Sequence, residues 1–171
     1  ISRELKTQLM EEFGKIPKMK LINVIGGGSS AAGFWSEFIH YPKKHVELIG
    51  VEAKYCAPLT TNAKLAILHG AAQYCLTDKN GQIKETHSIS AGLDYPGVSP
   101  LHCFLKDTGR ARYCCASDEQ ALAAFKLVTQ LEPSVKPSLE PSHCLHEVIR
   151  LAPKLNKDEI IIYNNCGHAY K

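Results

Sequence analysis

The chain has 171 residues, of which 44% are hydrophobic and 22% charged, with a formal net charge of +3. These values are typical of one globular domain with a core of its own. They argue against two classes of partner: no run of basic residues suggests nucleic acid, and no apolar stretch approaches the ~18 residues that span a bilayer. Residues 1–10 are too charged for a signal peptide, so we expect a cytoplasmic protein.

Seven cysteines form an odd set without a Cys-x-x-Cys pair. They are Cys56, Cys75, Cys103, Cys114, Cys115, Cys144 and Cys166. Disulfide frameworks belong to small secreted domains with even, patterned counts. We therefore expect reduced thiols that serve mostly as small apolar fillers.

The first 42 residues predict a helix, followed by a strand, a glycine loop and a second helix. Apolar spacing predicts a helix over residues 2–13, which ends at Gly14 and Pro17. Residues 19–25 predict a buried strand, followed by the run Gly26-Gly27-Gly28-Ser29-Ser30. We expect Ser29 or Ser30 to cap a helix that begins at Ala31 and ends near residues 40–42.

A glycine loop between a strand and a helix is suited to bind an anion. Glycine lets the backbone approach a ligand closely, and the first N–H groups and the dipole of the helix both favour negative charge. We predict that this loop holds a phosphate.

A second strand at residues 46–51, closed by Glu52, completes a β-α-β unit and indicates an α/β fold with a parallel sheet. Residues 53–62 predict a loop, and residues 64–74 a short helix or an irregular segment. Asn80-Gly81 predicts a hairpin turn. Residues 82–103 lack periodicity, which is typical of a long functional loop.

The C-terminal part predicts two helices between two further strands. Residues 111–116 predict a strand, and Ser117 with Gln120 forms a capping-box pattern at the start of a helix. We expect Ser142 to cap another helix, and residues 160–163 to form the last parallel strand.

Three ligand classes can be compared at the glycine loop. It has neither the Lys nor the Ser/Thr spacing of a Walker A loop. Gly26-x-Gly28-x-x-Ala31 does fit a dinucleotide fingerprint, with Glu52 where a ribose-binding acid would lie. Three consecutive glycines and two serines favour a monophosphate. A turn that needs glycine for packing alone remains the structural alternative.

Three blocks of sequence resemble the β subunit of tryptophan synthase. They are the glycine loop, the run Gly81-Gln82-Ile83-Lys84-Glu85-Thr86-His87-Ser88-Ile89-Ser90-Ala91-Gly92-Leu93-Asp94-Tyr95-Pro96-Gly97-Val98, and Leu139-Glu140-Pro141-Ser142-His143. The resemblance covers all of this chain but only the C-terminal part, somewhat less than half, of the family's chain. It implies residues 1–171 as a single three-layer α/β domain, the cofactor-phosphate-binding part of a two-domain enzyme whose N-terminal half is absent.

The resemblance also implies an activity and its partners. The family is a group of fold-type II pyridoxal 5'-phosphate (PLP) lyases that replace the β-hydroxyl of L-serine with indole to give L-tryptophan. Indole reaches them through a tunnel from an α subunit. Because half of a two-domain enzyme exposes an apolar inter-domain face, we expect this chain to form a homodimer or otherwise self-associate.

Site residues carry over by position. Gly26, Gly27, Gly28, Ser29 and Ser30 would hold the PLP phosphate, with Glu140 beside the ring and Cys166 at its nitrogen. Asp94 and Glu140 would be catalytic. The carbonyls of Gly26, Tyr95 and Gly97 would bind Na⁺ or K⁺, and Leu68 and His69 would lie at the gate of the tunnel.

The sequence departs from the family at four points. Ser30 stands where the family usually has Asn, Cys166 where it has Ser, and His168-Ala169-Tyr170-Lys171 where it reads Arg-Gly-Asp-Lys. The Schiff-base lysine lies in a His-Lys-x-Asn motif, and this chain has no His-Lys pair. We therefore expect the chain alone to be inactive. The alternatives are a non-catalytic module that binds PLP phosphate or a partner subunit, and an NAD-type dinucleotide-binding domain.

Simpler structural interpretations exist for several of these residues. Glu52 would be an exposed carboxylate at the end of a strand, Asp94 a turn residue, and Glu140 a helix N-terminal acid. His143 and His146 are spaced to share a metal or to form a partly buried polar pair. Cys114-Cys115 would pack in a strand rather than form a redox pair.

Overall fold

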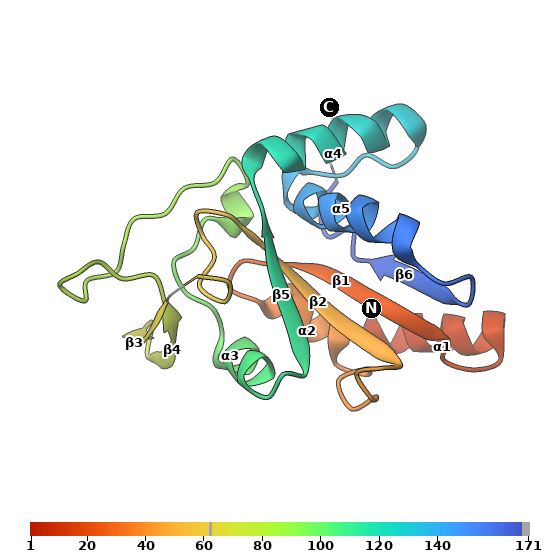
Figure 1. Cartoon of the computed structure of the whole chain (residues 1–171), viewed down its shortest axis with the longest axis horizontal. Coiled ribbons are helices and arrows are strands. Elements are labelled where there is room, and N and C mark those ends of the chain that lie inside the picture. Colours follow the sequence, from red (N-terminus) through yellow and green to blue (C-terminus); the bar gives the residue numbers. More distant parts are fainter. Residues whose placement is uncertain (62, 169–171) are drawn as a thin grey trace.

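A parallel sheet of four strands lies at the centre of the computed structural model, in the order β5-β2-β1-β6 (Figure 1). The strands are β1 (Lys18–Ile25), β2 (Val46–Ala53), β5 (Ala111–Ala116) and β6 (Glu159–Tyr163). The central strand β1 pairs in parallel with β2 from Met19–Val46 to Ile25–Glu52, and with β6 on its other side. The predicted α/β class and parallel sheet are confirmed.

The structure describes residues 1–61 and 63–168. Asn62, at the end of the loop predicted over residues 53–62, lies outside the described residues. The same holds for Ala169, Tyr170 and Lys171, which belong to the altered C-terminal motif.

Helices cover both faces of the sheet, as the three-layer prediction requires. One core cluster joins β1 and β2 to α1 (Ser2–Phe13), α2 (Ser29–Trp35) and α3 (Pro100–Asp107). The other joins the same strands to α5 (Leu139–Leu151), which packs beneath α4 (Asp118–Leu131), as Figure 1 shows. Side chains alternate along a strand, so Leu21 faces the first cluster and Ile22 the second.

Two helix starts differ from the prediction. Helix α2 begins at Ser29, is capped by Gly28 without a side-chain bond, and ends at Trp35, well before residue 40. Helix α5 begins at Leu139 after Ser138, so Ser142 is not its cap. The Ser142 hydroxyl donates to the Ser138 carbonyl, one turn back. The capping box at the start of α4 is confirmed.

The prediction for residues 64–74 is wrong, because the segment forms an antiparallel hairpin. Strands β3 (Lys64–Leu68) and β4 (Ala71–Cys75) make a separate small sheet. Their two-residue turn, His69-Gly70, has positive φ at both residues (50° and 79°), as a tight hairpin turn requires. A turn also forms at Asn80-Gly81, with the Gly81 N–H donating to the Asp78 carbonyl and Thr77 paired with Ile83, but only Gly81 of the two has a positive φ (81°), so the turn is wider than the tight type expected.

Two short 3₁₀ helices complete the described chain, η1 (Ala91–Leu93) and η2 (Ala152–Lys154). Helix α3 was not predicted, although Ser99-Pro100 is a typical helix start. Within the described ranges no helix has the length and apolar character needed to cross a membrane.

The core face beneath α2 is expected to carry much of the stability. Phe38 is fully buried in the first cluster, whereas Phe104 on α3 is 61% exposed. We expect Phe38→Ala to lower the free energy of unfolding by about 3–5 kcal/mol, because it removes buried area and leaves a cavity. Phe104→Ala is the matched control, with an expected change below about 1 kcal/mol. Urea denaturation measures both, and equal losses would contradict this assignment of the core.

Candidate functional site

A small cleft opens at the carboxyl ends of β1 and β6. Its volume is about 290 Å³, and it collects residues from four distant segments of the chain. The lining residues are Val24, Gly26, Gly27, Gly28, Ser29, Ser30, Gly92, Leu93, Ser138, Glu140, Cys166 and Gly167. The chain leaves β1 towards β2 on one side, while β6 joins on the other, and such a switch point is where open α/β sheets bind ligands.

The glycine loop, residues 26–30, is held from behind by a buried histidine. His102 Nε2 lies 2.8 Å from the Gly28 carbonyl oxygen, and its Nδ1 lies 2.9 Å from the Tyr113 hydroxyl. A carbonyl only accepts, so Nε2 carries the proton and Nδ1 accepts from Tyr113. Burial lowers the pKa of His102, which keeps the ring neutral in this arrangement.

Two glycines of the loop have a steric reason to be glycine. Gly28 has a φ of 99°, and a Cβ there would overlap the His102 ring. A Cβ on Gly26 would lie 2.6 Å from the Gly92 carbonyl oxygen. Gly27 differs: a Cβ on it would meet no atom within 4 Å, although the residue lines the cleft.

The Ser30 side chain is held by two amides that the sequence analysis missed. Asn23 Nδ2, from β1, and Asn164 Nδ2, just after β6, each lie 3.2 Å from Ser30 Oγ. Asn23 is fully buried and is the one polar residue among residues 21–25 of β1. The only signal for Asn23 in the sequence is a polar residue within an apolar run.

Glu140 lies in this cleft, in the first turn of α5. Its Oε2 accepts a 2.6 Å hydrogen bond from the Ser138 hydroxyl, and its Oε1 one of 3.2 Å from the Gly92 N–H. Burial acts to raise the pKa of Glu140, but these donors outweigh it and hold the pKa below its ordinary value. The carboxylate is therefore ionised at neutral pH and is fixed in place. This agrees both with a position beside a cofactor ring and with a helix N-terminal acid.

Cys166 lines the same cleft, so the structure brings it together with Glu140 and the glycine loop. Desolvation of the thiol raises the pKa of Cys166, and the nearby Glu140 carboxylate acts in the same direction. At neutral pH the group is a protonated thiol, a weak hydrogen-bond donor.

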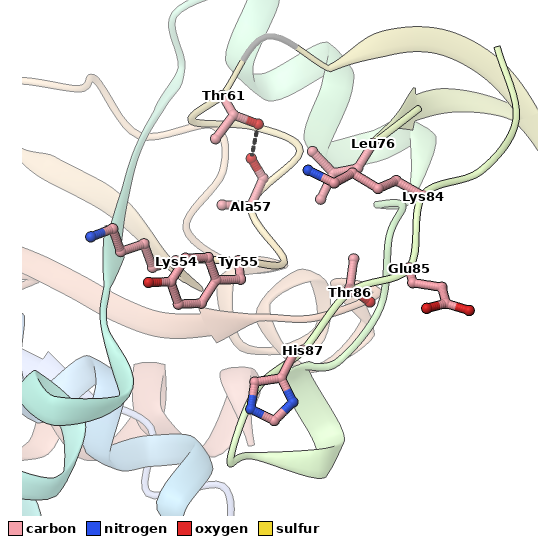
Figure 2. Close-up of a pocket in the computed structure, with 9 residues that line it drawn as sticks. All are labelled: Lys54, Tyr55, Ala57, Thr61, Leu76, Lys84, Glu85, Thr86 and His87. Atoms are coloured by element: carbon pink, nitrogen blue, oxygen red, sulfur yellow. Dashed lines mark hydrogen bonds between the residues drawn. The ribbon is translucent and has the colours of Figure 1, made fainter. Parts of the chain in front are cut away.

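Asp94 does not join this cleft. Its Oδ1 accepts hydrogen bonds from the Thr86 hydroxyl at 2.7 Å and the Cys56 thiol at 3.4 Å. Thr86 lines a second cleft of about 650 Å³, which Figure 2 shows between residues 54–61 and the segment that carries Lys84 and His87. Of the two residues expected to be catalytic, Glu140 thus lines the small cleft, whereas Asp94 lines neither cleft, although the preceding Leu93 lines the small one.

The expected cation ligands are also divided. Gly26 lines the small cleft, and neither Tyr95 nor Gly97 does. The Tyr95 hydroxyl instead lies 2.9 Å from His69 Nδ1, at the tip of the β3–β4 hairpin, and a Cβ on Gly97 would lie 3.0 Å from Leu68. Tyr95 and Gly97, expected at the cation site, are therefore neighbours of Leu68 and His69, which are expected at the tunnel gate.

The interpretation of Glu52 as an exposed strand-end carboxylate is wrong. Glu52 is fully buried, and it accepts hydrogen bonds from the Leu59 N–H (2.9 Å) and from the N–H (2.9 Å) and hydroxyl (2.8 Å) of Thr60. Burial raises the pKa of Glu52 to about 7, although these donors act against the rise. Glu52 holds the loop after β2 and is not free to bind a ribose.

Of the two histidines, His143 and His146, only His143 has a structural role that the hydrogen bonds show. His143 is fully buried, with Nδ1 at 3.1 Å from the Leu139 carbonyl oxygen and 3.4 Å from Ser90 Oγ. Among residues 1–61 and 63–168, no three His, Cys, Asp or Glu residues are grouped so that they could hold a metal. Cys114 is half-buried in β5 and Cys115 is exposed, so strand packing accounts for the first only.

Comparison with known proteins gives a consistent set of relatives. No protein-family model matches the chain. Tryptophan synthase beta chains match over its whole length: those of Allorhizobium ampelinum and Cereibacter sphaeroides are 46% identical and that of Chromobacterium violaceum 42%. The chain spans 43–44% of the length of these relatives. Among solved structures, a threonine deaminase from T.th. shares the fold, with a TM-score of 0.68 and 15% identity over 99% of this chain and 56% of that one.

The last two glycines of the triplet provide a test of the loop geometry. We expect Gly28→Ala to lower the free energy of unfolding by about 2–4 kcal/mol, because it combines a positive φ with a clash against His102. Gly27→Ala is the matched control and is expected to change it by less than about 1 kcal/mol. Equal losses for Gly28→Ala and Gly27→Ala in thermal or urea denaturation would show that the contact between Gly28 and His102 does not fix the loop.

The buried Glu52 predicts a specific pH dependence of stability. Its folded-state pKa of about 7 lies above the ordinary 4.5, so folding takes up a proton between these values and stability falls as the pH rises through 7. We expect this contribution, on the order of 3 kcal/mol, to be absent from Glu52→Gln. Unfolding free energies at pH 5 and pH 8 measure it, with the exposed Glu85→Gln as control. Parallel profiles for Glu52→Gln and the unsubstituted chain would contradict it.

Proposed function

We propose, from the premise that this chain is homologous over its whole length to part of the tryptophan synthase beta chain, that the small cleft binds the phosphate of PLP. One observation carries the proposal. The three segments that the sequence resemblance linked to the cofactor, at the glycine loop, Glu140 and Cys166, converge on one cleft although more than 130 residues of chain separate the first from the last.

The residues present fit a phosphate ester. Gly27 offers backbone to the cleft with space where a side chain would lie, and Ser29 and Ser30 add hydroxyl groups. Helix α2 has only seven residues, so we assign most of the binding to these local donors and less to a helix dipole. The cleft volume lies at the lower end of the ~300–1,000 Å³ found for small-molecule sites.

The other two residues would contact the ring of the cofactor. When bound, PLP supplies an electron sink for carbanion chemistry on an amino acid. Glu140, ionised and fixed by Ser138 and Gly92, would present a carboxylate to the ring. Cys166, protonated, would offer only a weak donor to the ring nitrogen and so would leave that nitrogen neutral, as the family's Ser does.

For the intact enzyme we propose PLP-dependent β-replacement of L-serine with indole to give L-tryptophan. Residues 1–171 would supply its phosphate-binding domain, with a second copy and an α subunit as partners. Asp94, which accepts a hydrogen bond from Thr86 at the larger cleft, would close the site over serine, and the carbonyls near Tyr95 and Gly97 would bind Na⁺ or K⁺. The chain contains no His-Lys pair, so we infer that residues 1–171 alone do not form tryptophan.

The departures at Cys166 and His168 favour a second candidate, a non-catalytic module that retains the phosphate site. It predicts phosphate-dependent PLP binding without turnover even in the longest natural form of the protein. The dinucleotide alternative is disfavoured, because the burial of Glu52 removes its ribose-binding acid.

Ligand titration tests the proposal. We expect PLP to bind residues 1–171 and to protect them against thermal unfolding, because glycine-loop amides and serine hydroxyls bind its phosphate. Pyridoxal, which lacks the phosphate, and NAD are the matched ligands and are expected to give little or no shift. Isothermal titration calorimetry and thermal melts measure both effects. Equal binding of PLP and pyridoxal, or selective binding of NAD, would overturn the assignment.

A further inference from the structure

We propose that Asn23 and Asn164 hold the Ser30 hydroxyl as a pure hydrogen-bond donor, aimed at an unprotonated oxygen of the bound phosphate. This inference rests on the proposed function and deepens it. It assigns a positioning role to two residues that do not line the cleft themselves.

The argument begins with the hydrogen-bonding capacity of a hydroxyl group, which has one donor and two acceptor positions. Ser30 Oγ accepts from Asn23 Nδ2 and from Asn164 Nδ2, each at 3.2 Å, so both acceptor positions are filled. No described residue accepts a hydrogen bond from Ser30 Oγ, and Ser30 lines the cleft. The remaining proton is therefore available to a ligand in that cleft.

The amide of Asn23 cannot rotate to reverse its role. Asn23 Oδ1 accepts a 2.8 Å hydrogen bond from the Val24 N–H, which has only a proton to offer. The oxygen of the amide is thereby fixed on Val24 and its NH₂ group on Ser30. Because Asn23 is fully buried, turning the amide would leave both groups unsatisfied.

Asn164 reaches Ser30 from the other side of the switch point. Its backbone N–H donates to the Ile22 carbonyl at 3.1 Å, which extends the pairing of β6 with β1 by one residue. The two amides thus come from adjacent strands and converge on one hydroxyl at their carboxyl ends.

A hydroxyl that can only donate favours one form of the ligand. A phosphate monoester carries its second proton with a pKa of about 6, so at neutral pH its oxygens are acceptors. A group that can only donate, such as an ammonium, would face Ser30 donor to donor. The structure therefore assigns to Ser30 the recognition of an unprotonated phosphate oxygen, in place of the amide that the family usually has there.

A double-mutant cycle tests the inference, with PLP and pyridoxal as ligands of residues 1–171. We expect Ser30→Ala to weaken PLP binding about 10-fold or more, because it removes a hydrogen bond to a charged group. Asn164→Ala is expected to weaken it by a smaller factor, about 3-fold. In the Ser30→Ala background, Asn164→Ala is expected to have no further effect, because it acts through the Ser30 hydroxyl.

Controls separate this role from general stability. Ser30→Thr keeps the hydroxyl and is expected to retain most of the affinity, and Asn80→Ala, in an exposed turn remote from the cleft, is expected to leave it unchanged. No variant is expected to alter the weak binding of pyridoxal. If thermal melts show that Asn164→Ala unfolds, Asn164→Ser takes its place in the cycle.

The outcomes distinguish the two proposals. If the unsubstituted chain binds PLP no better than pyridoxal, the phosphate site and this inference are both wrong. If PLP binds through its phosphate but the effects of Ser30→Ala and Asn164→Ala multiply independently, the inference about Asn164 is wrong and the phosphate site stands. Coupling of the two substitutions, with rescue by Ser30→Thr, supports the inference.

Discussion

The hydrogen bond from His102 to the Gly28 carbonyl oxygen fixes the shape of the candidate site. It joins α3 to the turn between β1 and α2, and the Tyr113 hydroxyl on β5 sets the tautomer of the imidazole. Trp35 packs edge-on against the same ring, so the donor is held by the core as well as by hydrogen bonds. A loop of consecutive glycines would otherwise sample many conformations, and ordering it on ligand binding would cost entropy. The buried histidine removes that cost before any ligand arrives.

The parallel sheet explains why residues far apart in sequence share one cleft. All four strands run in the same direction, so their carboxyl ends lie along one edge. The glycine loop leaves β1 at this edge, and the segment with Asn164 and Cys166 leaves β6 beside it. The start of α5 then brings Glu140 against the backbone of Gly92. Each contribution is local, and the register of the strands brings them together.

The sequence predicted the elements whose signals are local. Periodicity and turn residues gave the central strands, the helix over residues 2–13 and the capping box at Ser117, and the motif blocks gave the residues that line the cleft. What it missed depends on tertiary contacts. Glu52 is buried because the loop that follows β2 folds over it. Helix α3 was missed because it begins in a stretch without clear periodicity. That Asp94 stays outside the cleft that Glu140 lines depends on the fold of the loop around it, which no spacing along the chain reports.

The position of β6 has a consequence for how the protein matures. This strand lies beside β1, more than 130 residues earlier in the chain, and it carries the last groups that the cleft requires. During synthesis the glycine loop leaves the ribosome before the opposite wall of the cleft, which cannot form until Cys166 and Gly167 have followed. Contacts of such long sequence separation also form slowly, because a large loop must close first. The cleft is thus completed late in the folding of the nascent chain, only once β6 has joined the sheet.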